Sequence, residues 1–141
     1  MLKKMLTAFF VILISFVFLS CKDKGAKYIA STEEFENLFS NSIKYDIRSI
    51  EECEQGHIPT FNCMGGVEDS RKLVDTILLS VKDKDKSIII IANSNDIDRL
   101  KEIFQMLIKE KYKNLYSFEG GYENYKKLKG DKFVPEEGCD C

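Results

Sequence analysis

The stretch Ser87–Asp98 is where the sequence places the chemistry of this protein. Four consecutive isoleucines, Ile88–Ile91, form an apolar run without alternation, which is typical of a strand buried on both faces of a parallel sheet. Polar residues follow, and apolar residues then return at helical spacing from Leu100 to Ile108. In open α/β sheets ligands bind where strands end and helices begin, because the first amides of the helix attract anions. The intervening loop is therefore the predicted ligand site. It consists of Ala92, Asn93, Ser94, Asn95, Asp96 and Ile97.

This loop contains no thiol, so cysteines elsewhere are the alternative nucleophiles. Cys63 lies in a predicted loop, and Cys139 and Cys141 form a pair at the end of the chain. Two thiols one residue apart can bind a soft metal or form a strained, reducible bridge. Beyond Cys21, the sequence has four cysteines, which allow three disulfide connectivities between which the sequence does not choose.

Neither a metal nor a cofactor is predicted. His57 is the only histidine, so no second imidazole exists to share a zinc ion. The formal net charge is −2, and removal of residues 1–20, with their two lysines and no acid, would change it to −4. A mildly acidic chain without a basic patch is not expected to bind nucleic acid.

The N-terminus has the pattern of an export signal. Two lysines precede the apolar run Leu6–Leu19, which is too short to span a membrane comfortably and fits a secretory signal. The sequence Phe18–Cys21 resembles the bacterial lipobox, in which the cysteine is lipidated. The resemblance implies a signal peptide at residues 1–20, lipidation of Cys21 and a polar tether at 21–26. The predicted location is extracytoplasmic, on a bacterial membrane, because two or more acyl chains anchor a protein firmly.

Strands and helices alternate along the rest of the chain, which predicts one α/β domain with a central, mostly parallel sheet flanked by helices. Besides the isoleucine strand, the predicted strands are Lys27–Ala30, Ile43–Ile47 and Leu115–Phe118. The predicted helices follow Ser31, occupy Ser49–Gln55, begin at Gly65–Gly66, and occupy Asp98–Lys111 and Tyr122–Leu128. Ser31 and Glu34 have the form of a capping box. The last residues, Gly130–Cys141, are predicted to be loosely attached, with a flexible tail at 131–141.

Two motifs resemble the rhodanese homology domain. The segment Tyr45–Pro59 has that family's Asp-x-Arg strand end, its Glu-Glu step and its Gly-His-Ile-Pro turn. The segment Asn114–Tyr125 resembles the family's closing strand, double glycine and aromatic. The resemblance covers about residues 27–130, in the family's order, and implies its three-layer fold. The matching motif residues are Asp46, Arg48, Gly56, His57, Pro59, Gly120 and Gly121.

The family's chemistry requires a cysteine at the first position of the loop after the central strand, where it carries a persulfide. A thiolate there is stabilised by helix amides and by arginines. In this sequence the matching position is Ala92, and the arginine positions hold Asn93 and Ile97. Asp96 and Asp98 add negative charge, and Asn95 or Asp96 is predicted to cap the helix. No catalytic residue is therefore expected in this loop.

The remaining motif residues are predicted to be structural. His57 is expected to fix the backbone of its turn by hydrogen bonding, and Asp46 and Arg48 are expected to form a charge pair at the strand end. Cys53 replaces the family's usual aromatic, so it is predicted to be a small core residue.

These observations favour an envelope-anchored binding or interaction module without sulfurtransferase activity. Its expected partners are the membrane, through the lipid anchor, and a small anion or a protein at the emptied loop. The alternative is a sulfurtransferase or thiol-redox protein that uses a displaced cysteine, either Cys63 or the Cys139/Cys141 pair.

Overall fold

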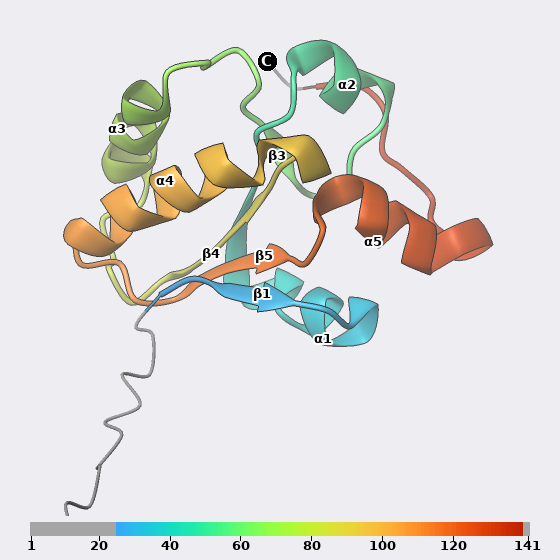
Figure 1. The fold of residues 1–141 in the computed structure, drawn as a ribbon, viewed down its shortest axis with the longest axis horizontal. Helices are drawn as coiled ribbons and strands as arrows, with labels where there is room; N and C mark the ends of the chain where they lie inside the picture. The colour runs from blue at the N-terminus through green and yellow to red at the C-terminus, as the bar shows by residue number, and fades with distance from the viewer. Residues whose placement is uncertain (1–24, 140–141) are drawn as a thin grey trace, which may run out of the picture.

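Strand β4 (Ser87–Ile91) is the central strand of a five-stranded parallel sheet with the order β1-β5-β4-β2-β3. The computed structural model describes residues 25–139. The sheet lies between two groups of helices (Figure 1). The predicted α/β fold with a parallel sheet is thus confirmed, and within the described residues every strand pair is parallel.

The other four strands flank β4 on both sides. Strand β2 (Ser42–Asp46) pairs with β4 along its whole length. The remaining strands are β1 (Lys27–Ile29), β3 (Asn62–Cys63) and β5 (Leu115–Phe118). Strand β3 was predicted as a loop. It is only two residues long and pairs with the edge of β2, and such a short segment has no hydrophobic periodicity to reveal it.

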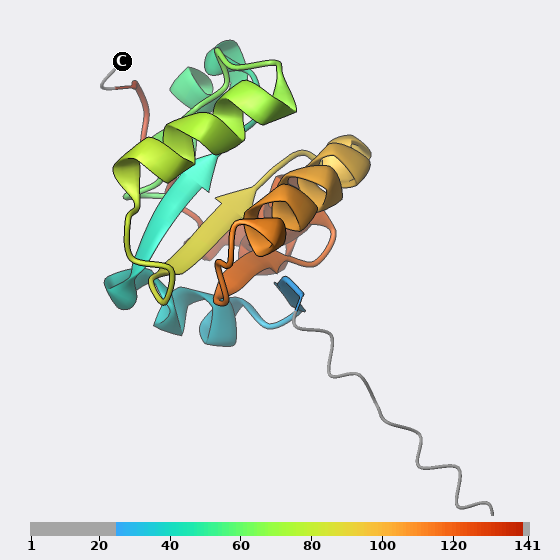
Figure 2. The ribbon, with the colours of Figure 1, turned by 90° about the vertical axis from the view of Figure 1, so that its left-hand side faces the viewer.

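Two helices cover each face of the sheet. Helices α3 (Ser70–Ser80) and α4 (Ile97–Lys109) lie together on one face (Figure 2). Helices α1 (Thr32–Asn37) and α5 (Gly121–Lys129) pack on the other. The short helix α2 (Ile50–Gln55) follows β2. Three 3-10 turns complete the described elements: η1 (Phe39–Asn41), η2 (Ser94–Asp96) and η3 (Gly130–Lys132).

The isoleucines of β4 divide the core into two halves. Ile88 and Ile90 pack with the apolar side chains of α3 and α4. Ile89 and Ile91 pack with α1 and α5. All four side chains are fully buried, because successive residues of a strand point to opposite faces and both faces are covered. The unbroken apolar run is explained by this double burial.

The start of α3 and the cap of α1 differ from the predictions. Helix α3 begins at Ser70, because the Asp69 side chain accepts a hydrogen bond from the amide of Lys72 and caps the helix. Gly65 does not open the helix. It packs so closely against the backbone of Arg48 that a Cβ added at Gly65 would lie 1.9 Å from the Arg48 carbonyl oxygen. At α1, Ser31 accepts from the amide of Glu34, which is only one half of the predicted capping box. The complete capping box is at α2, between Ser49 and Glu52.

Several sequence predictions lie outside the described residues. These are the signal peptide at 1–20, lipidation of Cys21, most of the tether at 21–26 and the fate of Cys141. Within residues 25–139, no helix is both long enough and apolar enough to cross a bilayer.

The core on the α1 face predicts a sharp difference between two substitutions. Phe35 is fully buried and contacts the rings of Phe39, Phe118 and Tyr125. We expect Phe35→Ala to lower the free energy of unfolding by about 3–5 kcal/mol, through lost burial and a cavity. Leu79→Ala, at a side chain that is 74% exposed, should change it by less than about 0.5 kcal/mol. Urea denaturation would measure both, and equal effects would contradict this assignment of the core.

Candidate functional site

The predicted ligand loop lies at the C-terminal end of β4, in the centre of the sheet. Ala92 is fully buried, and its carbonyl oxygen accepts a hydrogen bond of 2.9 Å from the amide of Tyr122. The chain then turns through η2 and enters α4. The loop therefore has the position that the sequence predicted, directly after the central strand, and its first residue is a buried alanine.

Two carboxylates of the chain itself bind the polar groups of this loop. The amide of Ser94 donates a 2.8 Å hydrogen bond to Oε2 of Glu123. The side-chain amide of Asn93 donates to both carboxylate oxygens of Glu52, at 3.0 Å each. An anionic ligand that approached these groups would meet two negative charges already in place. Glu52 belongs to the Glu-Glu step of the sequence motif, but neither glutamate was predicted to contact the loop. The signal was weak, since a glutamate in the first turn of a helix is a common helix-stabilising choice.

Glu52 also links the loop to helix α2. Its carboxylate accepts from the amide and the hydroxyl of Ser49 as well as from Asn93. Burial raises the pKa of the Glu52 carboxyl, but the hydrogen bonds from Asn93 and Ser49 outweigh it and leave the pKa below its ordinary value. Glu52 therefore remains a carboxylate near neutral pH and holds Asn93 in place.

The predicted side-chain cap of α4 is wrong. Asp96 occupies the N-cap position, but its side chain accepts no capping hydrogen bond. It lies instead 3.5 Å from the guanidinium of Arg99. Arg99 donates a second, 2.6 Å hydrogen bond to the carbonyl of Val67. The arginine nearest to the loop in the sequence is thus held by Asp96 at the end of η2 and by the segment before α3.

Asp46 and Arg48 form the predicted charge pair at the end of β2. The guanidinium donates to both carboxylate oxygens, with Nη2 2.7 Å from Oδ2. Nη2 also donates to the carbonyl of Gly56 at 2.7 Å, and the guanidinium lies 3.4 Å from the centre of the Tyr122 ring. Both charged residues are buried. A buried pair with its donors satisfied braces the β2–α2 segment, and Arg48 is held in this structural contact.

A cavity of about 360 Å³ opens beside the loop. Its charged lining residues are Arg48 and Lys126, against Glu52 and Glu123. Asp96 and Asp98, the acidic residues at the end of the loop and the start of α4, do not line this cavity. The cavity is therefore lined by charges of both signs.

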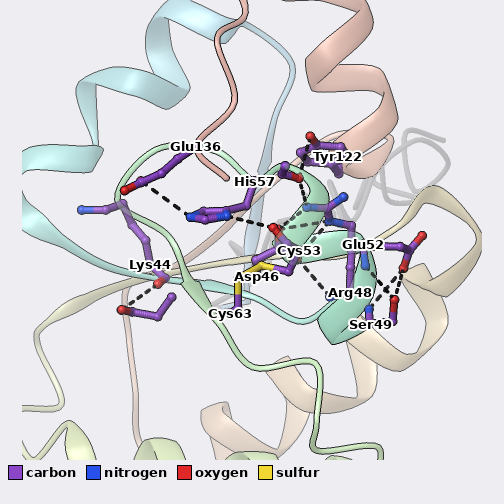
Figure 3. The surroundings of a disulfide bond; sticks show 12 residues. Lys44, Asp46, Arg48, Ser49, Glu52, Cys53, His57, Cys63, Tyr122 and Glu136 are labelled. Carbon is purple, nitrogen blue, oxygen red and sulfur yellow. Dashed lines mark hydrogen bonds and ion pairs between the residues drawn. A yellow bond between two sulfur atoms is a disulfide. The ribbon is translucent and has the colours of Figure 1, made fainter. Parts of the chain in front are cut away.

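Cys53 and Cys63 form a disulfide bond with a Cα–Cα distance of 5.9 Å. Cys53 is fully buried, as predicted, and Cys63 is half-buried. The bond joins α2 to β3 next to His57 (Figure 3). The two sulfurs and one ring nitrogen of His57 lie within 4.8 Å of one another. Because both sulfurs are in the disulfide, the thiolate that metal binding or sulfur transfer requires is available only after reduction.

His57 has the structural role that the sequence predicted, with one partner that it did not. Nδ1 lies 2.9 Å from the carbonyl oxygen of Cys53. Nε2 lies 3.6 Å from Oε2 of Glu136, on the C-terminal segment (Figure 3). The imidazole therefore bridges the disulfide region and the end of the chain.

The C-terminal segment, predicted to be loosely attached, makes regular backbone contacts with the turn after α2. His57 and Glu136 exchange two backbone hydrogen bonds of 2.9 Å. The Glu136 side chain accepts from the amide of Thr60, and the amide of Gly138 donates to the carbonyl of Glu54. Polar composition suggested a loose tail, but the backbone groups of the turn provide partners that composition does not reveal.

The thiols do not lie in the loop cavity. Cys63 and Cys139 line a different cavity, of about 420 Å³, together with His57 and Glu136. Cys139 is itself disulfide-bonded. Among residues 25–139, no cysteine lines the cavity beside Asn93.

Comparisons with known proteins agree with the geometry. Residues 31–128 match the rhodanese-like domain family. No curated protein matches the chain. The fold is similar to the crystal structure of the Alr3790 protein from Anabaena, with a TM-score of 0.59 and 16% identity over 75% of this chain and 79% of that chain.

Two further structures of the same Anabaena protein are also similar. The crystal structure of its Rhodanese_3 like domain has a TM-score of 0.54 and 18% identity, over 71% of this chain and 96% of that chain. The solution structure of its rhodanese-like domain has a TM-score of 0.57 and 17% identity, over 77% and 78%. At these identities the likeness establishes the fold.

The double glycine is explained by its contact with the loop, which predicts a measurable difference. A Cβ on Gly121 would lie 2.7 Å from the carbonyl oxygen of Ala92, whereas one on Gly130 would contact nothing within 4 Å, and both residues have positive φ. We expect Gly130→Ala to cost about 1–2 kcal/mol from backbone strain alone. Gly121→Ala should cost about 1–3 kcal/mol more than Gly130→Ala, because the backbone at Ala92 must move away from the added Cβ. Denaturant unfolding measures both free energies of unfolding. Equal losses in the two variants would show that the backbone at Ala92 moves away from the added Cβ at no cost.

Proposed function

Because this chain belongs to the rhodanese-like domain family, we propose that it uses the family's scaffold as a binding or interaction module, without sulfurtransferase activity, anchored at a bacterial cell envelope. The observation that carries the proposal is the state of the loop after β4. Ala92 stands at the nucleophile's position, and Glu123 and Glu52 bind the polar groups around it.

The chemical argument has two parts. Sulfur transfer by the family mechanism passes through a persulfide, which needs a thiolate that attacks the donor. A methyl group cannot form one. In addition, the donors are anions such as thiosulfate, and the carboxylate of Glu123 occupies the hydrogen bond that the Ser94 amide would offer to them. Restoring the thiol alone would therefore give only a weak acceptor of sulfur.

The charged rim of the loop cavity supports recognition of a partner. Glu52, Glu123 and Lys126 are exposed, and they surround the cavity together with buried Arg48. Exposed charges of both signs contribute mainly to orientation and selectivity at a protein interface. A protein partner with a complementary pattern suits this rim better than a small anion does.

The alternative function is thiol-disulfide exchange at Cys53–Cys63. The observation that favours it is that Cys63 is half-buried and lines an open cavity beside His57, whereas Cys53 is fully buried. A thiolate from outside would attack the Cys63 sulfur, and the electron pair of the broken S–S bond would pass to Cys53. A second external thiol would then release Cys63, so that two external thiols become one disulfide and the protein gains two thiols.

Envelope anchoring rests on the sequence of residues 1–26. The basic start, the apolar run and Cys21 together fit a lipoprotein signal. The fold begins directly afterwards, with β1 at Lys27, which leaves a short polar tether between anchor and domain.

Sulfur loading tests the proposal directly. The purified protein is reduced, exposed to thiosulfate and examined by intact-mass spectrometry. We expect no added sulfur on the parent and one on Ala92→Cys. The double variant Ala92→Cys/Glu123→Gln should load faster, because Gln keeps an acceptor for the Ser94 amide but removes the charge. Thermal unfolding verifies that each variant is folded.

Single cysteine-to-serine variants complete this experiment. Sulfur on the parent that disappears in Cys63→Ser, or in Cys139→Ser or Cys141→Ser, would reject the non-catalytic proposal in favour of a displaced thiol. Equal loading of the two Ala92→Cys proteins would mean that Glu123 does not exclude the donor.

Anchoring gives a separate prediction. In a bacterial host that processes lipoproteins, the full chain should be found in the membrane fraction, and Cys21→Ser should prevent lipid attachment, as shown by metabolic labelling with a fatty acid. Cys63→Ser is the matched control and should keep the label. Labelling of Cys21→Ser at the parent's level would exclude the proposed anchor.

A further inference from the structure

A second cavity, of about 510 Å³, lies between the ends of α1 and α5. None of the described residues that line it also lines the cavity beside the Ala92 loop. Its volume falls in the range of about 300–1,000 Å³ that is typical of small-molecule sites. Its apolar walls are formed by Phe39, Ile58, Pro59, Tyr125, Phe133 and Val134. The site would therefore accept the apolar body of a ligand.

The walls are well defined by packing. Phe133 makes an edge-to-face contact with Tyr125, at 5.7 Å between ring centres. Ile58 and Tyr125 are almost completely buried and form the floor. Aromatic walls fixed by such contacts need little reorganisation before binding, which lowers the cost of association.

The charged lining of this cavity is mainly positive. Lys44, Lys129 and Lys132 oppose the single carboxylate of Glu36, so the lining carries three positive charges against one negative, a net of +2, in a chain with a net charge of −2. Lys129 is paired with Glu36 at 2.7 Å. Burial raises the pKa of Glu36, but hydrogen bonds from Lys129 and Tyr125 outweigh this and leave the pKa lowered, so the pair remains charged.

Lys44 and Lys132 are the two lysines of the lining that take no part in this ion pair. The ammonium of Lys44 is half-buried and donates to the carbonyls of Phe39 and Ser42, at 2.7 and 3.2 Å. Within the described part of the chain, neither lysine forms an ion pair with an acidic side chain. Burial, and then the charge of Lys86, lower the pKa of Lys44. A half-buried ammonium without a counter-charge is unfavourable, and a bound anion would compensate it.

We propose that this cavity binds a small amphipathic anion, a carboxylate on an apolar body, with the carboxylate between Lys44 and Lys132 and the apolar part against Phe39, Tyr125 and Phe133. This site is independent of the loop after β4 and of the function proposed for it. It would give the protein a ligand of its own even though the family's catalytic position holds alanine.

Calorimetric titration of the full chain with dodecanoate, below its micelle concentration, tests the proposal. Dodecyltrimethylammonium has the same apolar chain with the opposite charge and serves as the matched ligand control. We expect saturable, salt-sensitive binding of dodecanoate and at least tenfold weaker binding of the cation. Equal binding of the two ligands, or none of dodecanoate, would overturn the proposal.

Variants locate the site. Lys44→Met should weaken dodecanoate binding about tenfold, which corresponds to about 1.4 kcal/mol, because it removes a charged hydrogen-bond donor. Lys132→Gln, at an exposed position, should weaken it about two- to fivefold. Lys127→Gln, on α5 but outside the cavity, should leave it unchanged. If Lys127→Gln weakens binding as much as Lys132→Gln does, the effect is one of net charge and the site is wrong.

A pair of variants at one exposed position guards against effects on folding. Val134 is 74% exposed and lines the cavity. Val134→Glu should weaken dodecanoate binding and Val134→Lys should preserve or strengthen it, with the same thermal stability in both. The reverse order would overturn the proposal.

Discussion

The burial of β4 on both faces is the constraint on which the rest of the structure depends. A strand in this position must be apolar at every residue, and it must be covered by helices on both sides. The alternation of Ile88 and Ile90 with Ile89 and Ile91 then defines two separate half-cores. The same burial fixes the loop at Ala92, because the strand ends where the chain leaves the covered sheet. The position of this loop is thus a consequence of core packing.

The polar groups of the loop after β4 have partners within the chain itself. The amide of Ser94 donates to Glu123, and the side-chain amide of Asn93 donates to Glu52. Both hydrogen bonds are exposed, so each replaces a hydrogen bond with water and its net contribution to stability is modest. Their consequence is that the loop is connected to α5 through Glu123 and to α2 through Glu52.

The edge of the sheet beyond β2 is held by a different set of interactions. The Asp46–Arg48 pair, the Cys53–Cys63 bond, and His57 with Glu136 together connect β2, α2, β3 and the C-terminal segment. Strand β3 has two residues and little apolar surface of its own, so it depends on these cross-links. The same region contains the half-buried sulfur of Cys63. The disulfide that stabilises this edge of the sheet is therefore also the candidate for thiol chemistry among the described residues.

The sequence by itself determined the class of fold, the central strand, the order of the major elements and the place of the loop after β4. Apolar periodicity, turn residues and the two motifs were sufficient, because each depends on neighbouring residues. It also determined that Ala92 cannot be a nucleophile. Only the tertiary structure decided which distant groups meet: Ser94 with Glu123, 29 residues apart, Thr60 with Glu136, 76 residues apart, and one disulfide pairing out of three. The cationic cavity between α1 and α5 likewise gathers Lys44 and Lys132 from opposite ends of the domain. The physical reason is that periodicity defines which face of an element is buried, whereas the partner of a polar side chain is set by how the elements pack.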